Sequence, residues 1–187
     1  MSTPTYLLVD GENIDATLGN HLLGGRRPTS EERPRWDRVR SFASGAFEGG
    51  DTKALFFLNA SSGNLPMTFV QALMAMDYRP IPLAGTASEK VVDIGIQRTL
   101  EALVGRPGDV LLASHDGDFL PHVTALLDGT RRVGVVGFRE YLSSGYTALV
   151  DRGLSIFDLE DDTRCFTTAL PRVRIIPLAS FDPTMYL

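Results

Sequence analysis

Cysteine and histidine are scarce in this chain of 187 residues, and their scarcity excludes several kinds of site. The single cysteine, Cys165, cannot supply a disulfide framework or a cysteine-built metal site. The three histidines, His21, His115 and His122, include no pair at the spacing of a zinc-protease helix. Zinc sites of the finger or protease type are therefore excluded.

Long apolar runs and an excess of basic residues are also missing. No window approaches the roughly 18 apolar residues of a membrane-spanning helix. Residues 1–4 lack the basic region and apolar run of a signal peptide. Lys and Arg total 18 against 23 Asp and Glu, so the net charge of −5 excludes a polybasic coat but allows a local basic face. We therefore expect a soluble cytoplasmic protein with no membrane partner.

Short apolar runs alternate with helix-length amphipathic segments, the pattern of a parallel α/β sheet in one domain. Strands are predicted at residues 6–9, 54–58, 81–83, 110–113 and 133–136. Such continuous apolar strands are buried on both faces, and prolines place the third strand near a sheet edge. Helices are predicted at 36–47, 65–76, 88–104, 118–127 and 141–150, with Ser88 as the N-cap of the third helix.

Two segments interrupt this alternation. Residues 19–35 are rich in Gly, Arg and Pro and are predicted to form a long loop, so that the first crossover helix begins only at about Trp36. From Asp158 the pattern changes to an acidic patch followed by β-prone stretches. We interpret residues 1–157 as one domain and residues 158–187 as a C-terminal extension packed on it. The extension could cover a sheet edge, form a homodimer contact or close over the site.

Acidic side chains follow two of the predicted strands. Asp10 follows the first strand, Asp116 and Asp118 follow the fourth, and Asp93 lies about one turn into the 88–104 helix. Ligands collect at the carboxyl ends of parallel strands, so these carboxylates converge if the two strands are neighbours. Carboxylates about 4 Å apart repel by about 4 kcal/mol at an effective dielectric of about 20, and a divalent cation relieves this repulsion. Ligands that are all oxygen favour Mg²⁺ or Mn²⁺, ions suited to phosphoryl transfer.

Single acidic residues also have plain structural interpretations. An Asp after a strand is often only a helix N-cap or a turn former, and Asp118 could cap the helix that follows. Glu12 and Asp15 are expected to be solvated, although Asp15 could lie at the rim of the site. His115 is expected to be a loop residue without a catalytic role. Convergence of two strands on one edge favours the functional interpretation of the set.

A local excess of arginine supplies a candidate surface for nucleic acid. Residues 21–40 hold six arginines against three acidic residues, a local charge of +3. We hypothesise that Arg26, Arg27 and Arg33 bind a phosphate backbone and that Trp36 is a base-stacking platform. The alternatives are a solvated arginine face, in a chain with sixteen arginines and two lysines, and a Trp36 that anchors the first helix in the core.

Three motifs together resemble a known family. Residues 9–14 are VDGENI, residues 90–93 are KVVD and residues 114–119 are SHDGDF. Their order and spacing resemble the NYN domain family of PIN-like nucleases, and in particular its bacterial LabA/DUF88 branch, over roughly residues 5–157. The resemblance implies a PIN-like three-layer α/β/α sandwich with a central, mainly parallel sheet. It also implies metal-dependent endonucleolytic cleavage, most often of RNA.

The resemblance assigns roles to individual residues. The implied catalytic and metal-binding residues, which would hold Mg²⁺ or Mn²⁺ directly or through water, are Asp10, Asp93, Asp116 and Asp118. Asn13 would orient Asp10 or contact the substrate, and Lys90 would place a point charge beside the scissile phosphate. Asn59 and Ser61, at the end of the second strand, are further candidates for substrate binding.

The chain departs from the family pattern at two positions. Many members carry another Asp six residues after the helix Asp, where this chain has Thr99, and Glu101 does not share that helix face. His115 replaces the small residue usual before Asp116. The alternative function is therefore a catalytically weak or inactive domain that binds RNA or a regulatory partner, and Mn²⁺ affinity would separate the two. Toprim-like and phosphatase-like domains fit less well, because the first strand ends in Asp-Gly-Glu.

Overall fold

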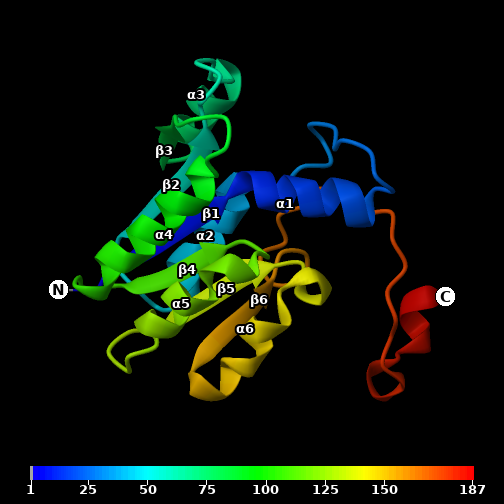
Figure 1. Cartoon of the computed structure of the whole chain (residues 1–187). Helices are drawn as coiled ribbons and strands as arrows, with labels where there is room; N and C mark the ends of the chain where they lie inside the picture. Colours follow the sequence, from blue (N-terminus) through cyan, green and yellow to red (C-terminus); the bar gives the residue numbers. More distant parts are fainter. Residues whose placement is uncertain (1) are drawn as a thin grey trace.

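A computed structural model describes residues 2–187 and shows a six-stranded sheet between two layers of helices (Figure 1). The strands are β1 (Thr5–Asp10), β2 (Thr52–Asn59), β3 (Tyr78–Leu83), β4 (Asp109–Ala113), β5 (Val133–Gly137) and β6 (Leu154–Asp158). Their order across the sheet is β3-β2-β1-β4-β5-β6, and every neighbouring pair is parallel. The predicted α/β/α sandwich is confirmed, and its sheet is parallel throughout.

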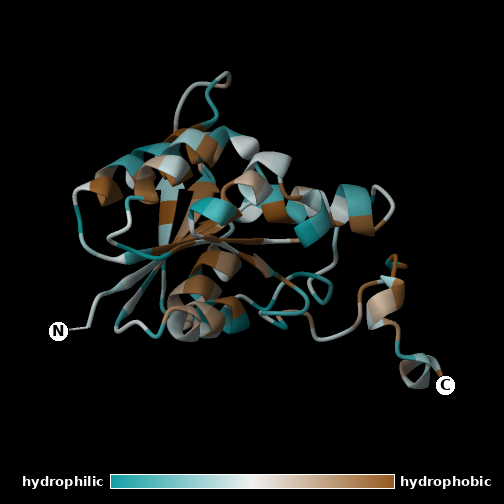
Figure 2. Cartoon of the chain, turned by 90° about the horizontal axis from the view of Figure 1, so that it is seen from below, coloured by the Kyte–Doolittle hydropathy of each residue, from teal (hydrophilic) through white to brown (hydrophobic). Residues whose placement is uncertain are grey.

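The helices cover both faces of the sheet (Figure 2). They are α1 (Gly11–Thr17), α2 (Trp36–Ala46), α3 (Met67–Ala75), α4 (Val91–Val104), α5 (Leu120–Leu126) and α6 (Ser144–Ala148). Side chains alternate along β1, so that Leu7 and Val9 pack with α1, α2 and α3, whereas Leu8 packs with α4, α5 and α6. The sheet is buried on both faces, as its continuous apolar strands predict.

The region after β1 differs from the prediction of a long loop beginning at residue 19. Residues 11–22 form α1 and a π-helical extension, η1 (Leu18–Leu22), and the loop begins only at Leu23. The reason is a buried stripe at intervals of four residues, Ile14, Leu18 and Leu22, which packs on the sheet. The predicted N-cap at Ser88 is also wrong, because α4 begins at Val91 after Lys90 in the N-cap position.

The two edges of the sheet differ in how well the sequence predicts them. β3 is an edge strand, as its prolines Pro80 and Pro82 predict. β6 forms the other edge and was not predicted, because its five residues lie next to the acidic patch and only its two ends are fully buried.

The chain after β6 first adds to the core and then leaves it. Leu159, Cys165 and Leu170 are buried with the α1–α3 side of the sheet. Residues 171–187 are largely exposed, and they stand apart from the sandwich (Figure 1). The division at residue 157 stays a prediction, although β6 crosses that boundary. No helix among residues 2–187 is long and apolar enough to span a membrane.

Candidate metal centre

The strand order creates one place where ligands are expected to bind. The crossovers from β1 to β3 lie on one face of the sheet and those from β3 to β6 lie on the other, so the direction of winding reverses between β1 and β4. Open parallel sheets bind ligands at the carboxyl ends of the strands on either side of such a switch point. In this chain those two strands lead into Asp10 and into residues 114–118.

Three carboxylates converge at this point. Asp93 in the first turn of α4, with Asp116 and Asp118 around the 3-10 turn η2 (Gly117–Phe119), place one oxygen each within 4.8 Å of one another. Asp93 and Asp116 are half-buried and Asp118 is exposed. None of the three forms an ion pair with a basic residue among residues 2–187. Their mutual repulsion is therefore not offset by an ion pair within residues 2–187.

Asp10 lies beneath this cluster and is only 2% exposed. Its carboxylate accepts hydrogen bonds from Ser114 Oγ at 2.9 Å and from the backbone N–H of Asn13 at 3.4 Å. Burial, with a smaller contribution from the charges of Asp93 and Asp116, raises the pKa of Asp10 to about 7. A side chain on residue 11 would overlap the buried ring of Phe56, so the glycine there lets α1 begin directly after Asp10.

Burial also raises the pKa of Asp93, and the nearby carboxylates Asp116, Asp118 and Glu12 add to this effect. The positive charge of Lys90 acts in the opposite sense. Lys90 is exposed in the N-cap position of α4, three residues before Asp93, and its placement beside a scissile phosphate stays a prediction. An acidic site in which two pKa values are raised is one where a cation would be bound favourably.

Ser114 connects the buried carboxylate to the cluster above it. Its hydroxyl donates to Asp10 and accepts a hydrogen bond from the backbone N–H of Asp116 at 3.2 Å. Asp116 in turn accepts from the N–H of Asp118 at 2.9 Å, so Asp116, and not Asp118, caps this turn. Tyr146 of α6 donates its hydroxyl proton to the carbonyl of Asp116 at 2.5 Å. Hydrogen bonds to Ser114 and Tyr146 thus hold the acidic turn in place.

His115 has a larger structural role than the sequence predicts. Its ring is 6% exposed and accepts a hydrogen bond at Nε2 from the N–H of Phe138 at 2.7 Å. The proton must therefore be on Nδ1, which lies 2.9 Å from Asn13 Oδ1 and donates to it. Burial, together with the charge of His21, lowers the pKa of His115 to about 4 and keeps the ring neutral. His115 positions Asn13 beside Asp10.

Asn59 and Ser61 reach the same edge at the end of β2 but do not join the cluster. Asn59 Oδ1 accepts from the N–H of Ser61 at 3.0 Å, and Ser61 Oγ accepts from the N–H of Gly85 at 3.1 Å. Both residues are exposed, and these hydrogen bonds shape the loop after β2. Their assignment to substrate binding stays a prediction.

The arginines after β1 are largely engaged by acidic residues of the same region. Arg26 pairs with Glu32 at 2.5 Å, and Arg33 pairs with Asp15 at 2.9 Å. Arg27 is exposed and forms no ion pair within residues 2–187. Asp15 lies outside residues 21–40, so its pair with Arg33 lowers the local charge from +3 to +2, and of Arg26, Arg27 and Arg33 only Arg27 has no ion pair within residues 2–187.

Trp36 is not a stacking platform. Its side chain is 6% exposed and packs edge-on against Phe56 with ring centroids 5.1 Å apart. Trp36 anchors α2 in the core, which was the alternative interpretation of this residue. Thr99 donates its hydroxyl proton to the carbonyl of Gly95 at 2.7 Å and lies about 120° around α4 from Asp93, away from the cluster.

No pattern in the sequence predicts the aromatic pair that lies near the acidic turn. His21 of η1 stacks on Tyr141 of η3 (Arg139–Tyr141), with centroids 4.8 Å apart and rings inclined by 16°. Both rings are exposed, and the influence of His21 on His115 places the pair near the acidic turn. The two residues are 120 positions apart, so only the fold brings them together.

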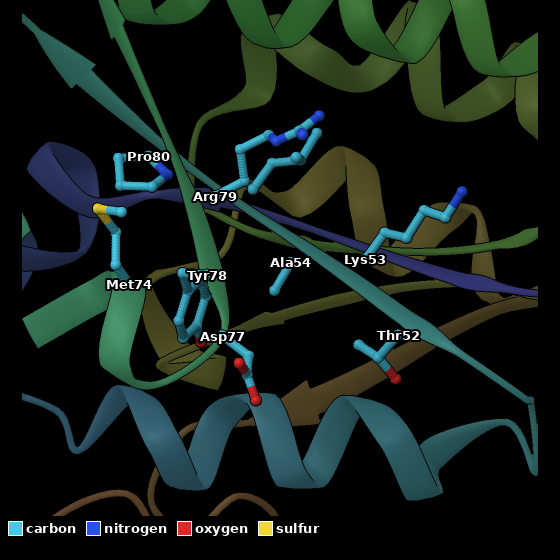
Figure 3. A pocket seen from close by; sticks show the side chains of 9 residues that line it. Thr52, Lys53, Ala54, Met74, Asp77, Tyr78, Arg79 and Pro80 are labelled. Carbon is cyan, nitrogen blue, oxygen red and sulfur yellow. The ribbon is translucent and has the colours of Figure 1, made fainter.

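A hollow of about 570 Å³ lies where β2 and β3 begin, at the opposite end of these strands from Asn59 (Figure 3). It is lined by the first residues of β2 and β3 together with Met74 and Asp77. Its lining contains no member of the carboxylate cluster. Among the described residues, the carboxylates that could hold a cation therefore lie outside this hollow.

Comparisons with known proteins agree with this arrangement. The model of the NYN domain matches residues 4–153. No curated protein was found to match the chain significantly. A crystal structure of a protein of unknown function from Vibrio parahaemolyticus is similar, with a TM-score of 0.67 and 20% sequence identity, and the match covers 86% of this chain and 95% of that one. At this identity the likeness concerns the fold alone, which is the PIN-like α/β sandwich.

Proposed function

The chain belongs to the NYN domain family, and from this premise we propose that it is a metal-dependent endoribonuclease that cleaves RNA phosphodiester bonds. The family indicates a nuclease-like fold and a nucleic-acid substrate. The observation that carries the proposal is the cluster of Asp93, Asp116 and Asp118 at the switch point of the sheet. The motif residues 9–14 further favour the LabA/DUF88-like branch of the family.

The donor set of this cluster fits Mg²⁺ or Mn²⁺. Such ions bind carboxylate oxygens at about 2.1 Å, so two ligands on opposite sides of the ion are about 4 Å apart. Oxygens within 4.8 Å of one another need only small side-chain rotations to reach that geometry. Burial is the main cause of the raised pKa values of Asp93 and Asp10, and an ion bound there would offset the carboxylate repulsion that adds to it.

The protein's own groups would position the ion and the substrate. Asp93, Asp116 and Asp118 would hold the ion, and Asp10 would support Asp116 through Ser114 or bind the ion through water. When bound, a divalent ion lowers the pKa of a coordinated water and offsets charge on the leaving oxygen. Lys90 and Asn13 would then contact the phosphate, since both border the carboxylates.

Further groups around the site support an RNA substrate. The exposed guanidinium of Arg27 can meet a phosphate of the backbone, and Arg26 can do so when its pair with Glu32 opens. The stacked rings of His21 and Tyr141 offer an exposed aromatic surface of the kind on which unpaired bases stack.

The test is cleavage of an end-labelled single-stranded RNA with Mn²⁺, with Mg²⁺ and with a chelator. We expect metal-dependent cutting that Asp116→Asn abolishes. Asp151→Asn, which removes the same charge from an exposed position on the 3-10 turn η4 (Val150–Arg152), is the matched control and should cut normally.

Titration of Mn²⁺ by calorimetry separates the two functions that remain. Cutting that survives Asp116→Asn would refute the site. Absence of both cutting and Mn²⁺ binding would favour the non-catalytic binding module, whereas Mn²⁺ binding without cutting of several RNAs would indicate a different substrate. Thr99, in place of a family Asp, prompts the alternative of a non-catalytic module, although residue 99 lies about 120° around α4 from Asp93.

A further inference from the structure

The segment from Pro171 onward exposes large apolar side chains that nothing else among residues 2–187 covers. Val173 and Ile175 are each 99% exposed, Leu178 is 88% exposed and Met185 is 80% exposed. The remaining apolar residues of the segment that are exposed are Ile176, Phe181, Tyr186 and Leu187. These eight side chains present on the order of 1,000 Å² of surface, whereas a soluble monomer usually shows a few hundred Å² in one patch.

Two arginines fix the direction in which this segment leaves the domain. Arg172 pairs with Glu140 and Glu160, and its side chain is only 12% exposed. Arg174 pairs with Glu160 and with Asp161, the latter at 3.0 Å. Because side chains alternate along an extended chain, arginines that face the domain turn Val173 and Ile175 toward solvent. The chain after these arginines stands clear of the sandwich (Figure 2).

The charge of the segment identifies the kind of surface that it fits. Among residues 175–187 only Asp182 is charged, and both arginines before them are already paired with acids of the same chain. A phosphate backbone or an anionic lipid surface is bound by unpaired positive charge, which this face does not offer. The segment therefore fits an apolar protein surface.

We propose that this surface is the same segment of a second copy of the chain, so that residues 171–187 of two copies pack together about a twofold axis. In such a contact each copy contributes the same patch, and an apolar patch is its own complement. The exposed area is comparable with the roughly 800 Å² that each partner contributes to a standard stable interface. Interfaces as apolar as this one are typical of permanent complexes. A second copy of the chain is available as a partner wherever the chain is made.

The oligomeric state of the full chain tests the proposal, measured by light scattering after size exclusion. We expect a dimer, and we expect the double variant Ile175→Asp, Leu178→Asp to be a monomer with an unchanged far-UV circular dichroism spectrum. Val150→Asp places the same charge on an exposed apolar residue of η4 and should leave the dimer intact. A monomeric native chain, or a dimer that the double variant leaves intact, would overturn the proposal. So would a native monomer that sediments with neutral lipid vesicles, because the segment would then bind membranes.

A cysteine scan tests the symmetric packing itself. Of the single variants Val173→Cys, Ile175→Cys, Leu178→Cys and Met185→Cys, the one nearest the twofold axis should form a covalent dimer rapidly under mild oxidation, whereas Thr168→Cys, at an exposed position before the segment, should not. The native Cys165 is fully buried and should not react. A dimer in which none of the four variants cross-links would place the segment against another face of the partner and refute the tail-to-tail contact.

Discussion

Replacing Asp10 with Asn should stabilise the metal-free protein at about pH 8 and change its stability little, or lower it, at about pH 5. Burial raises the pKa of Asp10 from 3.8 to about 7, so the folded state holds this proton more tightly than the unfolded state does. The free energy of unfolding therefore falls as the pH rises between about 4 and 7, by about 4 kcal/mol for a shift of about three units. Asn does not ionise and is free of this cost.

The free-energy cost of ionising Asp10 can be separated from the other effects of the Asp10→Asn substitution, because only this cost depends on pH. The Asn side chain keeps only part of the hydrogen bonding that Ser114 and Asn13 provide to Asp10, at a cost of about 1–3 kcal/mol that does not depend on pH. About 1.6 kcal/mol of the ionisation cost is already present at about pH 5. The stability gained by Asp10→Asn should therefore be about 2–3 kcal/mol larger at about pH 8 than at about pH 5. Titration of His115 cancels, since both proteins contain it.

Urea unfolding with a chelator present, followed by circular dichroism at both pH values, provides the measurement. The corresponding difference in the change of Tm is roughly 5–10 °C for a domain of this size. Asp151→Asn, on the surface, controls for the loss of a negative charge and should show no such difference. A change in stability that is equal at the two pH values would refute the reasoning that burial and neighbouring carboxylates hold Asp10 in its protonated form.

Three further substitutions test the surroundings of the site. Ser114→Ala should lower the free energy of unfolding by about 2–3 kcal/mol and weaken Mn²⁺ binding, since it leaves Asp10 Oδ2 and the N–H of Asp116 without a partner; calorimetry that shows unchanged Mn²⁺ affinity would contradict this. The free energy of unfolding of the native chain should fall by about 3 kcal/mol as the pH drops from about 6.5 to 4, because the unfolded histidine binds a proton and the buried ring of His115 does not. His115→Gln should abolish this fall, and parallel pH profiles of the two proteins would argue against it. Arg27→Ala should weaken RNA binding and reduce the slope of log affinity against log salt by about one, as measured by fluorescence anisotropy, and an unchanged slope would exclude a phosphate contact.

The sheet could be predicted because β1, β2, β4 and β5 each contain a run of apolar residues, while β3 is marked as an edge strand by its prolines. Burial on both faces leaves that pattern directly in the sequence, and it also explains why Asp10 and Asp116 stand out where the apolar runs stop. Their meeting depends on β1 and β4 being neighbours, which short crossovers and a switch point favour. The convergence of Asp93, Asp116 and Asp118 was therefore accessible to sequence reasoning.

Other features depend on contacts that no local pattern records. The segment after β1 contains Gly19, Gly24 and Gly25, which favoured a loop, but the buried stripe from Ile14 to Leu22 outweighs the glycine at its middle. Isolated arginines look free in a sequence, whereas the fold pairs Arg33 with an acid eighteen residues earlier. His115 is a single polar residue in a turn, and only the return of the chain after β5 buries its ring.

The central position of β1 has a consequence for when activity can arise. Asp10 and its partner Ser114 are 104 residues apart, and they meet only after β4 has paired with β1. While the chain is being synthesised, β1, β2, β3 and α4 leave the ribosome first. The edge of β1 that pairs with β4 stays unpaired until β4 and residues 114–118 emerge. A partly translated chain thus has Asp10 and Asp93 but cannot assemble the carboxylate cluster. The proposed nuclease activity would therefore first become possible when residues 114–118 have left the ribosome and β4 has paired with β1.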